Sequence, residues 1–245
     1  MTGHRGSGRG REPGRIAGAV AVFGELLITL GVVLGLFVAY SLWWTNVLAD
    51  RQADAAAHRL RQQWVQQPAS GDKAGRSPHR RAFAVGDGIG FLHVPALGKG
   101  YTVLIRMGTD PEVLNEGVAG VYQEPYAAAM PWAKSGNFAL AAHRDGHGAK
   151  FHNLDKVHRG DAVVVETADT WYVYRVDSTL PQTSKYNTGV VAPVPEGSGF
   201  THAGRYITLT TCTPVYTSRY RMAVWGTLVR TVPVDADRTP PAELR

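Results

Sequence analysis

Two stretches decide the fold of this chain: residues 206–214, Tyr-Ile-Thr-Leu-Thr-Thr-Cys-Thr-Pro, and residues 219–229, Arg-Tyr-Arg-Met-Ala-Val-Trp-Gly-Thr-Leu-Val. Both are rich in the branched and aromatic side chains that favour extended strands. The first predicted strand, Tyr206–Thr211, stops at Cys212, the only cysteine among 245 residues, and the second is Arg221–Val229. The pattern therefore predicts two strands with a thiol at the end of one and guanidinium groups at the start of the next.

Five more short runs of the same kind precede these two, with Gly and Pro between them. Short strands separated by turn residues predict a mostly β protein, either a barrel or a sandwich. Two short helices are predicted between the strands, over Asp110–Glu116 and Ala149–Val157. The five other predicted strands are Ile89–Val94, Thr102–Ile105, Phe138–Ala142, Ala162–Glu166 and Trp171–Val176.

The N-terminal part of the chain predicts one transmembrane helix. Residues 24–44 carry a single charge, Glu25, and about 20 apolar residues suffice to span a bilayer. Trp43 and Trp44 close this stretch, as aromatic side chains do at membrane interfaces, and the arginines within residues 1–15 predict a cytoplasmic N-terminus. A cleaved signal peptide is the alternative, because residues 53–55, Ala-Asp-Ala, offer a cleavage pattern, but the apolar stretch is longer than that of most signal peptides.

The remaining composition predicts the domain organisation. We expect a basic cytoplasmic tail over residues 1–15, a transmembrane anchor over 16–46, an extracytoplasmic helix and linker over 47–82, a catalytic domain over 83–232 and a loose C-terminal tail over 233–245. The formal charge of +6 is concentrated in residues 1–15 and 51–81. Because these basic residues flank the predicted membrane segment, they indicate a membrane surface and no nucleic-acid partner.

Three segments carry the candidate chemistry: His143 at the end of a predicted strand, Cys212, and the Arg219-Tyr-Arg221 stretch. Acyl transfer by a cysteine requires a thiolate, a proton donor for the leaving amine and a group that stabilises the oxyanion. Arg219 and Arg221 share a strand face, so spacing alone leaves both open for the third role. A buried inert thiol, an incidental histidine and a solvated arginine face are the competing interpretations.

A metal site is not predicted. His143, His147 and His152 are close in sequence, but the glycines between them argue against a helix that would align them. The sequence also lacks a second cysteine and an H-E-x-x-H motif. No metal and no cofactor are therefore expected.

A series of motifs, in a fixed order from residue 91 to residue 221, resembles the sortase family. The match is to the actinobacterial class E housekeeping type, whose T-C-T-P and R-Y-R patterns are similar to residues 211–214 and 219–221. Each motif alone is weak, and the ordered series is specific. The motifs are Phe91–Gly98, Gly108–Leu114, Gly136–Asp145, Phe151–Asp155, Gly160-Asp161, Leu209–Pro214 and Arg219–Arg221.

The resemblance implies an eight-stranded sortase β-barrel with short helices, preceded by the single membrane helix. It also implies a membrane-anchored cysteine transpeptidase with its catalytic domain outside the cell. Such an enzyme cleaves a C-terminal sorting signal of exported proteins, here of the L-A-x-T-G type, between Thr and Gly. The acyl group passes through a thioester to an amino group of a peptidoglycan precursor.

The resemblance also assigns roles to individual residues. It implies that Cys212 is the nucleophile, His143 the general acid and base, and Arg221 the residue that orients the substrate and stabilises the oxyanion. Thr211 matches a substrate-contacting position, and Arg219 is the second candidate for substrate binding. The calcium site of some class A sortases is not expected, because Asp110 and its neighbouring acids fit the start of a short helix better.

Three alternatives share this barrel. A pilin-polymerising sortase would use a lysine of a neighbouring pilin, although residues 67–83 show no aromatic-anchored lid motif. A hydrolytic cysteine peptidase would transfer the acyl group to water. A non-catalytic binding module would keep the barrel but lose one of the three site residues.

The segment Leu180–His202 falls where sortases seat the apolar residue of the signal.

Overall fold

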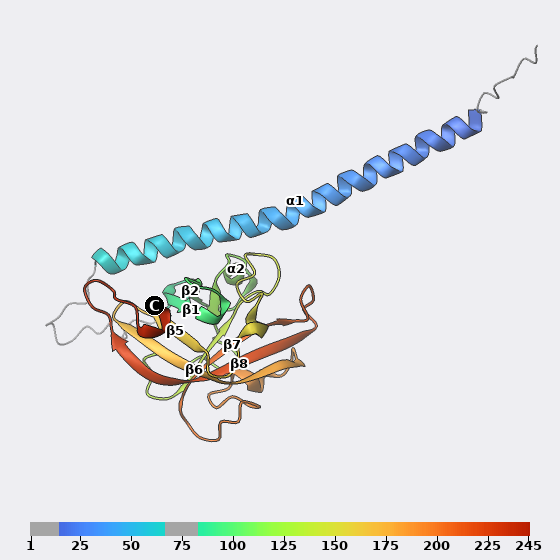
Figure 1. Cartoon of the computed structure of the whole chain (residues 1–245). Helices are drawn as coiled ribbons and strands as arrows, with labels where there is room; N and C mark the ends of the chain where they lie inside the picture. The colour runs from blue at the N-terminus through green and yellow to red at the C-terminus, as the bar shows by residue number, and fades with distance from the viewer. Residues whose placement is uncertain (1–14, 67–82) are drawn as a thin grey trace, which may run out of the picture. The chain divides into compact units, whose positions relative to one another are not determined.

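The structure, a computed structural model, describes residues 15–66 and 83–245. One helix, α1 (Arg15–Gln66), contains both the predicted membrane segment and the helix predicted to follow it (Figure 1). An 18-residue window in α1 has a mean hydropathy of 2.3, so this helix is long and apolar enough to cross a membrane. The predicted basic tail and linker lie almost wholly in residues 1–14 and 67–82, outside the described residues.

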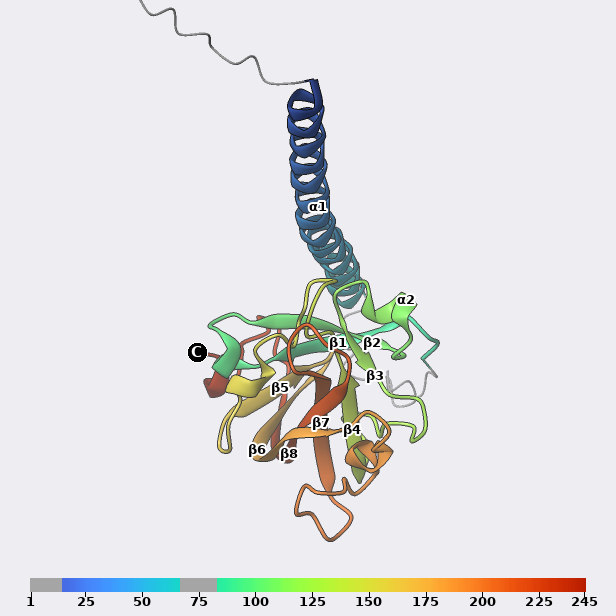
Figure 2. The same ribbon diagram turned by 90° about the vertical axis from the view of Figure 1, so that its right-hand side faces the viewer.

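Eight strands form a closed barrel in the order β1-β2-β3-β4-β7-β8-β6-β5, which confirms the predicted barrel (Figure 2). Two of the pairs, β2–β3 and β4–β7, are parallel, and all others are antiparallel. The strands are β1 (Gly88–His93), β2 (Thr102–Met107), β3 (Ala119–Val121), β4 (Gly136–Ala141), β5 (Ala162–Glu166), β6 (Thr170–Ser184), β7 (Arg205–Thr213) and β8 (Tyr220–Pro233).

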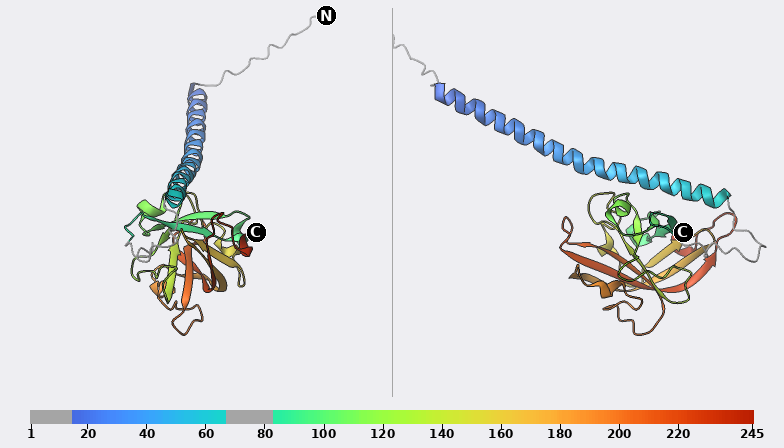
Figure 3. Two further views of the ribbon diagram at one scale, coloured as in Figure 1. Left: turned by 90° about the vertical axis from the view of Figure 1, so that its left-hand side faces the viewer. Right: turned by 180° about the vertical axis from the view of Figure 1, so that it is seen from behind.

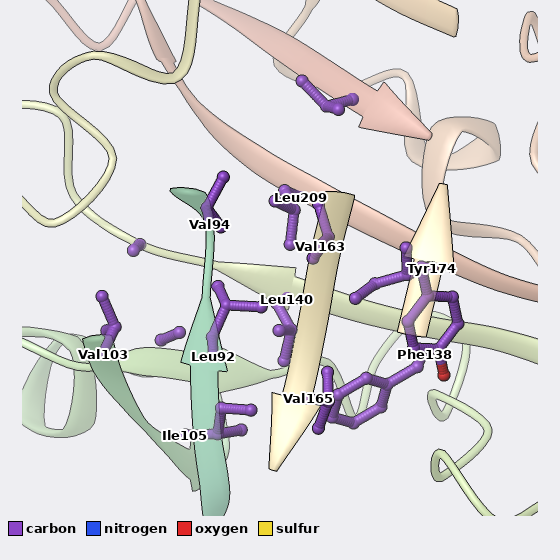
Figure 4. Packing of buried hydrophobic residues seen from close by; sticks show 14 of the residues in the cluster. Leu92, Val94, Val103, Ile105, Phe138, Leu140, Val163, Val165, Tyr174 and Leu209 are labelled. Carbon is purple, nitrogen blue, oxygen red and sulfur yellow. The ribbon is translucent and has the colours of Figure 1, made fainter. Parts of the chain in front are cut away.

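The barrel interior is filled by alternate side chains of these strands. Leu92, Ile105, Leu140, Val163 and Leu209 come from five different strands and converge in one cluster (Figure 4). Each of the five is fully buried. Because side chains alternate along a strand, the residues between them face the outside of the barrel, where the connecting segments pack.

Short helices lie between the strands, and two of them differ from prediction. The prediction of a helix over Ala149–Val157 is wrong, because only a 3-10 turn, η3 (Leu154–Lys156), forms there. The core residues Phe151, Leu154 and Val157 of the predicted range recur every three positions, which matches a 3-10 period better than an α-helical one. The other helices are α2 (Pro111–Leu114), which is shorter than predicted, and the 3-10 turns η2 (Pro95–Leu97), η4 (Thr188–Val191) and η5 (Ala242–Leu244).

Three strand predictions also need correction. Strand β6 continues past the predicted end at Val176 to Ser184, so the segment Leu180–His202 begins within this strand. Strand β7 continues through Cys212 to Thr213, so the thiol lies within the strand and not beyond its end. Pro214 follows and has no N–H to continue the ladder. The three-residue strand β3 was not predicted, because so short a run that includes Gly120 carries little strand signal.

The C-terminal residues 233–245, predicted to be loose, pack against the β5–β6 side of the barrel. Val234 and Leu244 pack on Trp171 and its buried neighbours. The guanidinium of Arg238 donates from Nε and Nη2 to Oε1 of Glu166, at 3.1 and 2.8 Å. Views from two further sides show the C-terminus beside the barrel (Figure 3). A buried carboxylate thus holds a proline-rich segment whose local composition predicts no order.

The part of α1 from Thr45 onward belongs to the same compact unit as the barrel. Its buried residues Ala53 and Leu60 form a second apolar cluster with Phe91 and Leu104 of β1 and β2. The Trp64 ring packs edge-on against the Phe91 ring, with 5.4 Å between the centroids. This stretch of helix is therefore a packed layer on the outer face of the barrel.

Candidate active site

The adjacent strands β7 and β8 carry Cys212 and Arg221, and His143 follows the end of the neighbouring strand β4. Ala141 pairs with Thr210 in the parallel β4–β7 ladder, and His143 and Cys212 each lie two residues further along. Cys212 is directly opposite Arg221 in the antiparallel β7–β8 ladder. A step of two residues keeps the same face of a sheet. We call His143, Cys212 and Arg221 the site row; it lies on the outer face of the barrel.

The surroundings of His143 fix the orientation of its ring. Its Nε2 lies 2.9 Å from Oδ1 of Asn115, which can only accept, so Nε2 carries the proton of this bond. The His147 ring lies beside it, with 5.3 Å between centroids. Burial lowers the pKa of His143 from 6.5, the nearby His147 lowers it further, and Asp145 opposes both. Asn115 lies at the C-terminal cap of α2 and was not predicted.

Arg144, also not predicted, supports Cys212 from beneath. The residue is 6% exposed, and its guanidinium donates from Nη1 to the carbonyl of Cys212 at 3.4 Å and to Oγ1 of Thr213 at 3.0 Å. Nη2 donates to Asp155 at 2.7 Å, so the buried charge is paired. The thiol itself is half-buried. The strand end that carries Cys212 is therefore held by an internal ion pair and not by the sheet alone.

The register separates the two arginines that the sequence left open. Residues directly opposite in an antiparallel pair have Cβ atoms about 5 Å apart, which places Arg221 beside Cys212. Its Nη1 donates to the carbonyls of Ser218 and Tyr220, both at 3.0 Å, which fixes the plane of the guanidinium. Arg219 precedes β8, is exposed, and stacks 5.3 Å from the Tyr220 ring centroid.

Thr211 does not join the row. It is 3% exposed, and its Oγ1 donates to the carbonyl of Ala142 at 2.8 Å, on the opposite face of β7 from Cys212. Thr210 does share the face of Cys212, and its hydroxyl lies 2.9 Å from the hydroxyl of Tyr122. Burial raises the pKa of Tyr122, while Thr210 and the charge of Arg221 lower it. Tyr122 and Thr210 are thus polar neighbours of the row that sequence reasoning missed.

The β6–β7 segment forms an apolar wall next to the row. Val190 and Val191 of η4 pack against Ala139, Ala223 and Trp225, which lie on the row's face of β4 and β8. Two strand side chains hold the wall in place. Nε1 of Trp225 donates to the carbonyl of Val190 at 2.9 Å, and Nδ2 of Asn137 donates to that of Ala192 at 3.0 Å. The outer face of β4, β7 and β8 therefore combines a polar row with a buried apolar cluster, whose partly exposed neighbours include Leu180 and Phe200.

No group of three or more His, Cys, Asp or Glu side chains in the described part of the chain could hold a metal ion. Glu116, one of the acids near α2, pairs with Arg106, and Nδ1 of His152 lies 2.9 Å from the carbonyl of Arg144. A cavity of about 310 Å³ lies elsewhere, between α1 and the β1–β2 hairpin, and contains no residue of the site row.

Residues 92–229 match the sortase domain family. Sortase SrtE2 of Streptomyces coelicolor is 58% identical over 249 residues, which cover 100% of this chain and 96% of that protein. Sortase SrtE1 of the same organism is 47% identical over 231 residues, which cover 94% of this chain and 62% of that protein.

Solved structures give the same result. The crystal structure of sortase E1 from Streptomyces coelicolor, with a tripeptide in its active site, superposes with a TM-score of 0.62 at 46% identity, over 67% of this chain and 100% of that one. Sortase E from Streptomyces avermitilis superposes with a TM-score of 0.59 at 36% identity, over 66% of this chain and 100% of that one.

Proposed function

Because the chain belongs to the sortase family, we propose that it is a cysteine transpeptidase in which the site row does the chemistry. The observation that carries this proposal is the strand arrangement: Cys212 and Arg221 are paired on β7 and β8, and His143 follows the end of β4, the strand that pairs with β7. The related sortase E1 structure holds a tripeptide in its active site, which supports a peptide substrate for this chain as well.

In the first half-reaction the Cys212 thiolate attacks the carbonyl carbon of the threonine in the sorting signal. A C–S bond forms, and the carbonyl oxygen takes up the electron pair. The Thr–Gly C–N bond then breaks, and the leaving amine takes a proton from the imidazolium of His143. The product is a thioester between Cys212 and the threonine of the cleaved protein.

In the second half-reaction an amino group of a cell-wall precursor attacks the thioester. The neutral His143 accepts the proton that this amine loses, a C–N bond forms, and the C–S bond breaks to release the thiolate. Each cycle thus returns His143 and Cys212 to their starting states. Water in place of the amine would give hydrolysis.

Arg221 would stabilise the oxyanion in both half-reactions. Nη1 is occupied by two carbonyls of its own strand end, whereas Nε and Nη2 make no hydrogen bond within the described residues. A planar guanidinium whose Nε and Nη2 N–H groups are not used within the described part of the chain suits a carbonyl oxygen that gains charge. Arg219 would contribute, at most, at the rim of the substrate site.

The leucine of the proposed L-A-x-T-G signal requires an apolar seat, and the wall around η4 supplies apolar side chains, of which Leu180 and Phe200 are partly exposed and Val190 and Val191 are buried. We place the leucine against this wall and the threonine at Cys212.

The α1 helix would anchor the enzyme in the membrane with residues 83–245 outside. Protease added to intact protoplasts should then digest the barrel and spare the N-terminal tail.

The central experiment uses the full chain in detergent or nanodiscs with an L-A-x-T-G peptide, with and without an added amine. Transpeptidation predicts a ligated peptide that appears only with the amine, and hydrolysis predicts the free acid in both samples. Absence of any cleavage at the Thr–Gly bond by the wild-type chain, under conditions where a related sortase E is active, would reject the proposal.

A further inference from the structure

The loop after His143 has an unusual backbone. Four successive residues have positive φ angles: Gly146 at 63°, His147 at 48°, Gly148 at 77° and Ala149 at 39°. Two of the four are not glycine, and such residues in the left-handed region cost about 1 kcal/mol or more each. A conformation of this kind persists only where surrounding contacts hold it. The loop also places His147 beside the ring of His143.

Two of the contacts that hold this loop come from α1. Oδ1 of Asn46 accepts a hydrogen bond from the backbone N–H of Gly148, at 3.0 Å. The carboxylate of Asp50 pairs with Nζ of Lys150, at 2.8 Å. The approach is close, since a Cβ on Gly148 would lie 2.8 Å from Oδ1 of Asp50. Asn46 and Asp50 are one helical turn apart and share a face of α1.

The same turn of α1 also contacts the segment that holds His143 from the other side. Gly117 has a φ of 72° and lies against Ala49, where an added Cβ would be 3.2 Å from the Ala49 carbonyl oxygen. Asn115, two residues earlier, accepts the hydrogen bond from Nε2 of His143. One turn of helix, residues 46–50, therefore contacts both segments that surround the imidazole.

We infer that Asn46 and Asp50 of α1 are positioning residues for His143, so that the catalytic apparatus extends into the helix that follows the predicted membrane segment. This inference rests on the function proposed above. The general attachment of α1 to the barrel does not depend on these two side chains, because Ala53, Leu60 and Trp64 pack on β1 and β2 further along the helix. Loss of the Asn46 and Asp50 side chains should therefore disturb the loop without detaching the helix.

The test uses the full chain in nanodiscs with the substitutions Asn46→Ala and Asp50→Asn. Asp54→Asn is the matched control, because Asp54 lies one turn further along α1 and is exposed. With peptide and amine as substrates, we expect kcat to fall by about three- to ten-fold for Asn46→Ala and Asp50→Asn, the effect of one hydrogen bond, with KM unchanged. Asp54→Asn should behave as wild type.

The pH profile separates positioning from a merely structural role. Burial and His147 both lower the pKa of His143. A loosened loop relieves these two effects, which outweigh the opposing charge of Asp145, so the limb of the kcat profile that belongs to His143 should move to higher pH in Asp50→Asn. The exchanged pair, Asp50→Lys with Lys150→Asp, should recover most of the lost rate. Profiles and rates for Asn46→Ala and Asp50→Asn that equal those of Asp54→Asn would overturn the inference.

A second readout needs no sorting signal. In the proposed site, the rate at which iodoacetamide alkylates Cys212 responds to the imidazole of His143, and the chain has no other thiol. We expect Asp50→Asn, but not Asp54→Asn, to change this rate. If the wild-type chain fails to cleave the peptide, the proposed function fails while this comparison still decides the inference. Equal alkylation rates for the two variants would reject it.

Discussion

Two clusters on this barrel each place a histidine and an arginine beside a group that carries or develops negative charge. In one cluster these side chains bond to the charged group, and in the other they bond to residues outside the cluster or to their own backbone. In the first, Glu166 of β5 is 2% exposed and accepts from His93 at 3.0 Å and from Arg238 at 2.8 and 3.1 Å. Arg61 of α1 lies 3.6 Å from the same carboxylate. We call these four residues the Glu166 cluster; its acid is saturated with partners.

The second cluster is the site row, whose members do not satisfy one another. His143 bonds to Asn115, and Arg221 bonds to backbone carbonyls of its own strand end. Among the described residues, no hydrogen bond or ion pair links two members of the row. The difference teaches that residue types alone do not mark a site. Internally paired charges hold segments together, and polar groups left unpaired with one another are available to a substrate.

The largest expected effect is in the row. Cys212→Ala should abolish cleavage and thioester formation, because no other thiol exists in the chain. The fold should survive, since alanine fits a half-buried strand position. Intact mass after incubation with the peptide reads the acyl adduct, and circular dichroism checks the fold. Transpeptidation by this variant would contradict the mechanism.

Arg221→Ala should lower kcat/KM by about 100- to 1,000-fold, which corresponds to about 3–4 kcal/mol for the loss of one oxyanion donor. Arg221→Lys should remain badly impaired, because an ammonium lacks the planar fork. Arg219→Ala is the matched control and should cost far less. Steady-state rates decide, and a crippled Arg219→Ala beside a near-normal Arg221→Ala would exchange the two roles.

His143→Ala should lower turnover by at least about 100-fold, the scale of one general acid–base group. His147→Ala should keep most of the rate. It should also raise the pKa of His143, because His147 lowers that pKa in the intact site, and thereby move the corresponding limb of the kcat profile to higher pH. Similar losses of rate in the two variants would show that His143 has no special role.

The Glu166 cluster should respond in stability and not in catalysis. Glu166→Gln should lower the free energy of unfolding by about 2 kcal/mol, the scale of charge-assisted hydrogen bonds. A larger loss is not expected, because Arg238 and Arg61 have side chains 27% and 46% exposed and can regain water. Urea unfolding followed by tryptophan fluorescence measures this change. A catalytic defect in the folded variant would remove the contrast between the clusters.

The smallest effect is a pH dependence of the same cluster. Burial alone raises the pKa of Glu166, but hydrogen bonds from His93 and Arg238 and the charge of Arg61 outweigh it, so the net pKa lies below 4.5. A lowered carboxyl pKa stabilises the fold above the unfolded-state value and ceases to do so as pH falls through the folded-state value. The stability difference between wild type and Glu166→Gln should therefore shrink below pH 4.5. A difference that grows there would contradict this assignment.

The barrel could be predicted because its strands have a strong local signal. The predicted runs at 162–166 and 206–211 lie within β5 and β7, whereas β3 is too short for its composition to reveal it. The alternation of side chains along a strand predicts that Arg219 and Arg221 share a face. The same alternation predicts that Thr211 and Cys212 point to opposite faces of their strand. The substrate role of Thr211 is predicted from the family resemblance alone, which does not say on which face of the strand a side chain lies.

The supports of the site could not be predicted in the same way. Asn115 and Asn46 reach the region of His143 from segments far apart in sequence, and nothing in their local sequence names a partner. The same holds for Arg238, which lies among prolines in the tail and finds its carboxylate on β5. Such contacts depend on the tertiary arrangement, so only the structure reveals them.

The parallel pairing of β4 with β7 sets the order in which the active site can form. Parallel neighbours require a crossover, and here β5 and β6 are made between them. β8 comes last and pairs with both β6 and β7, so a chain that ends before Tyr220 leaves the barrel open and lacks Arg221. Contacts this distant in sequence form slowly. During synthesis, the nucleophile therefore exists in the chain before the site that would use it.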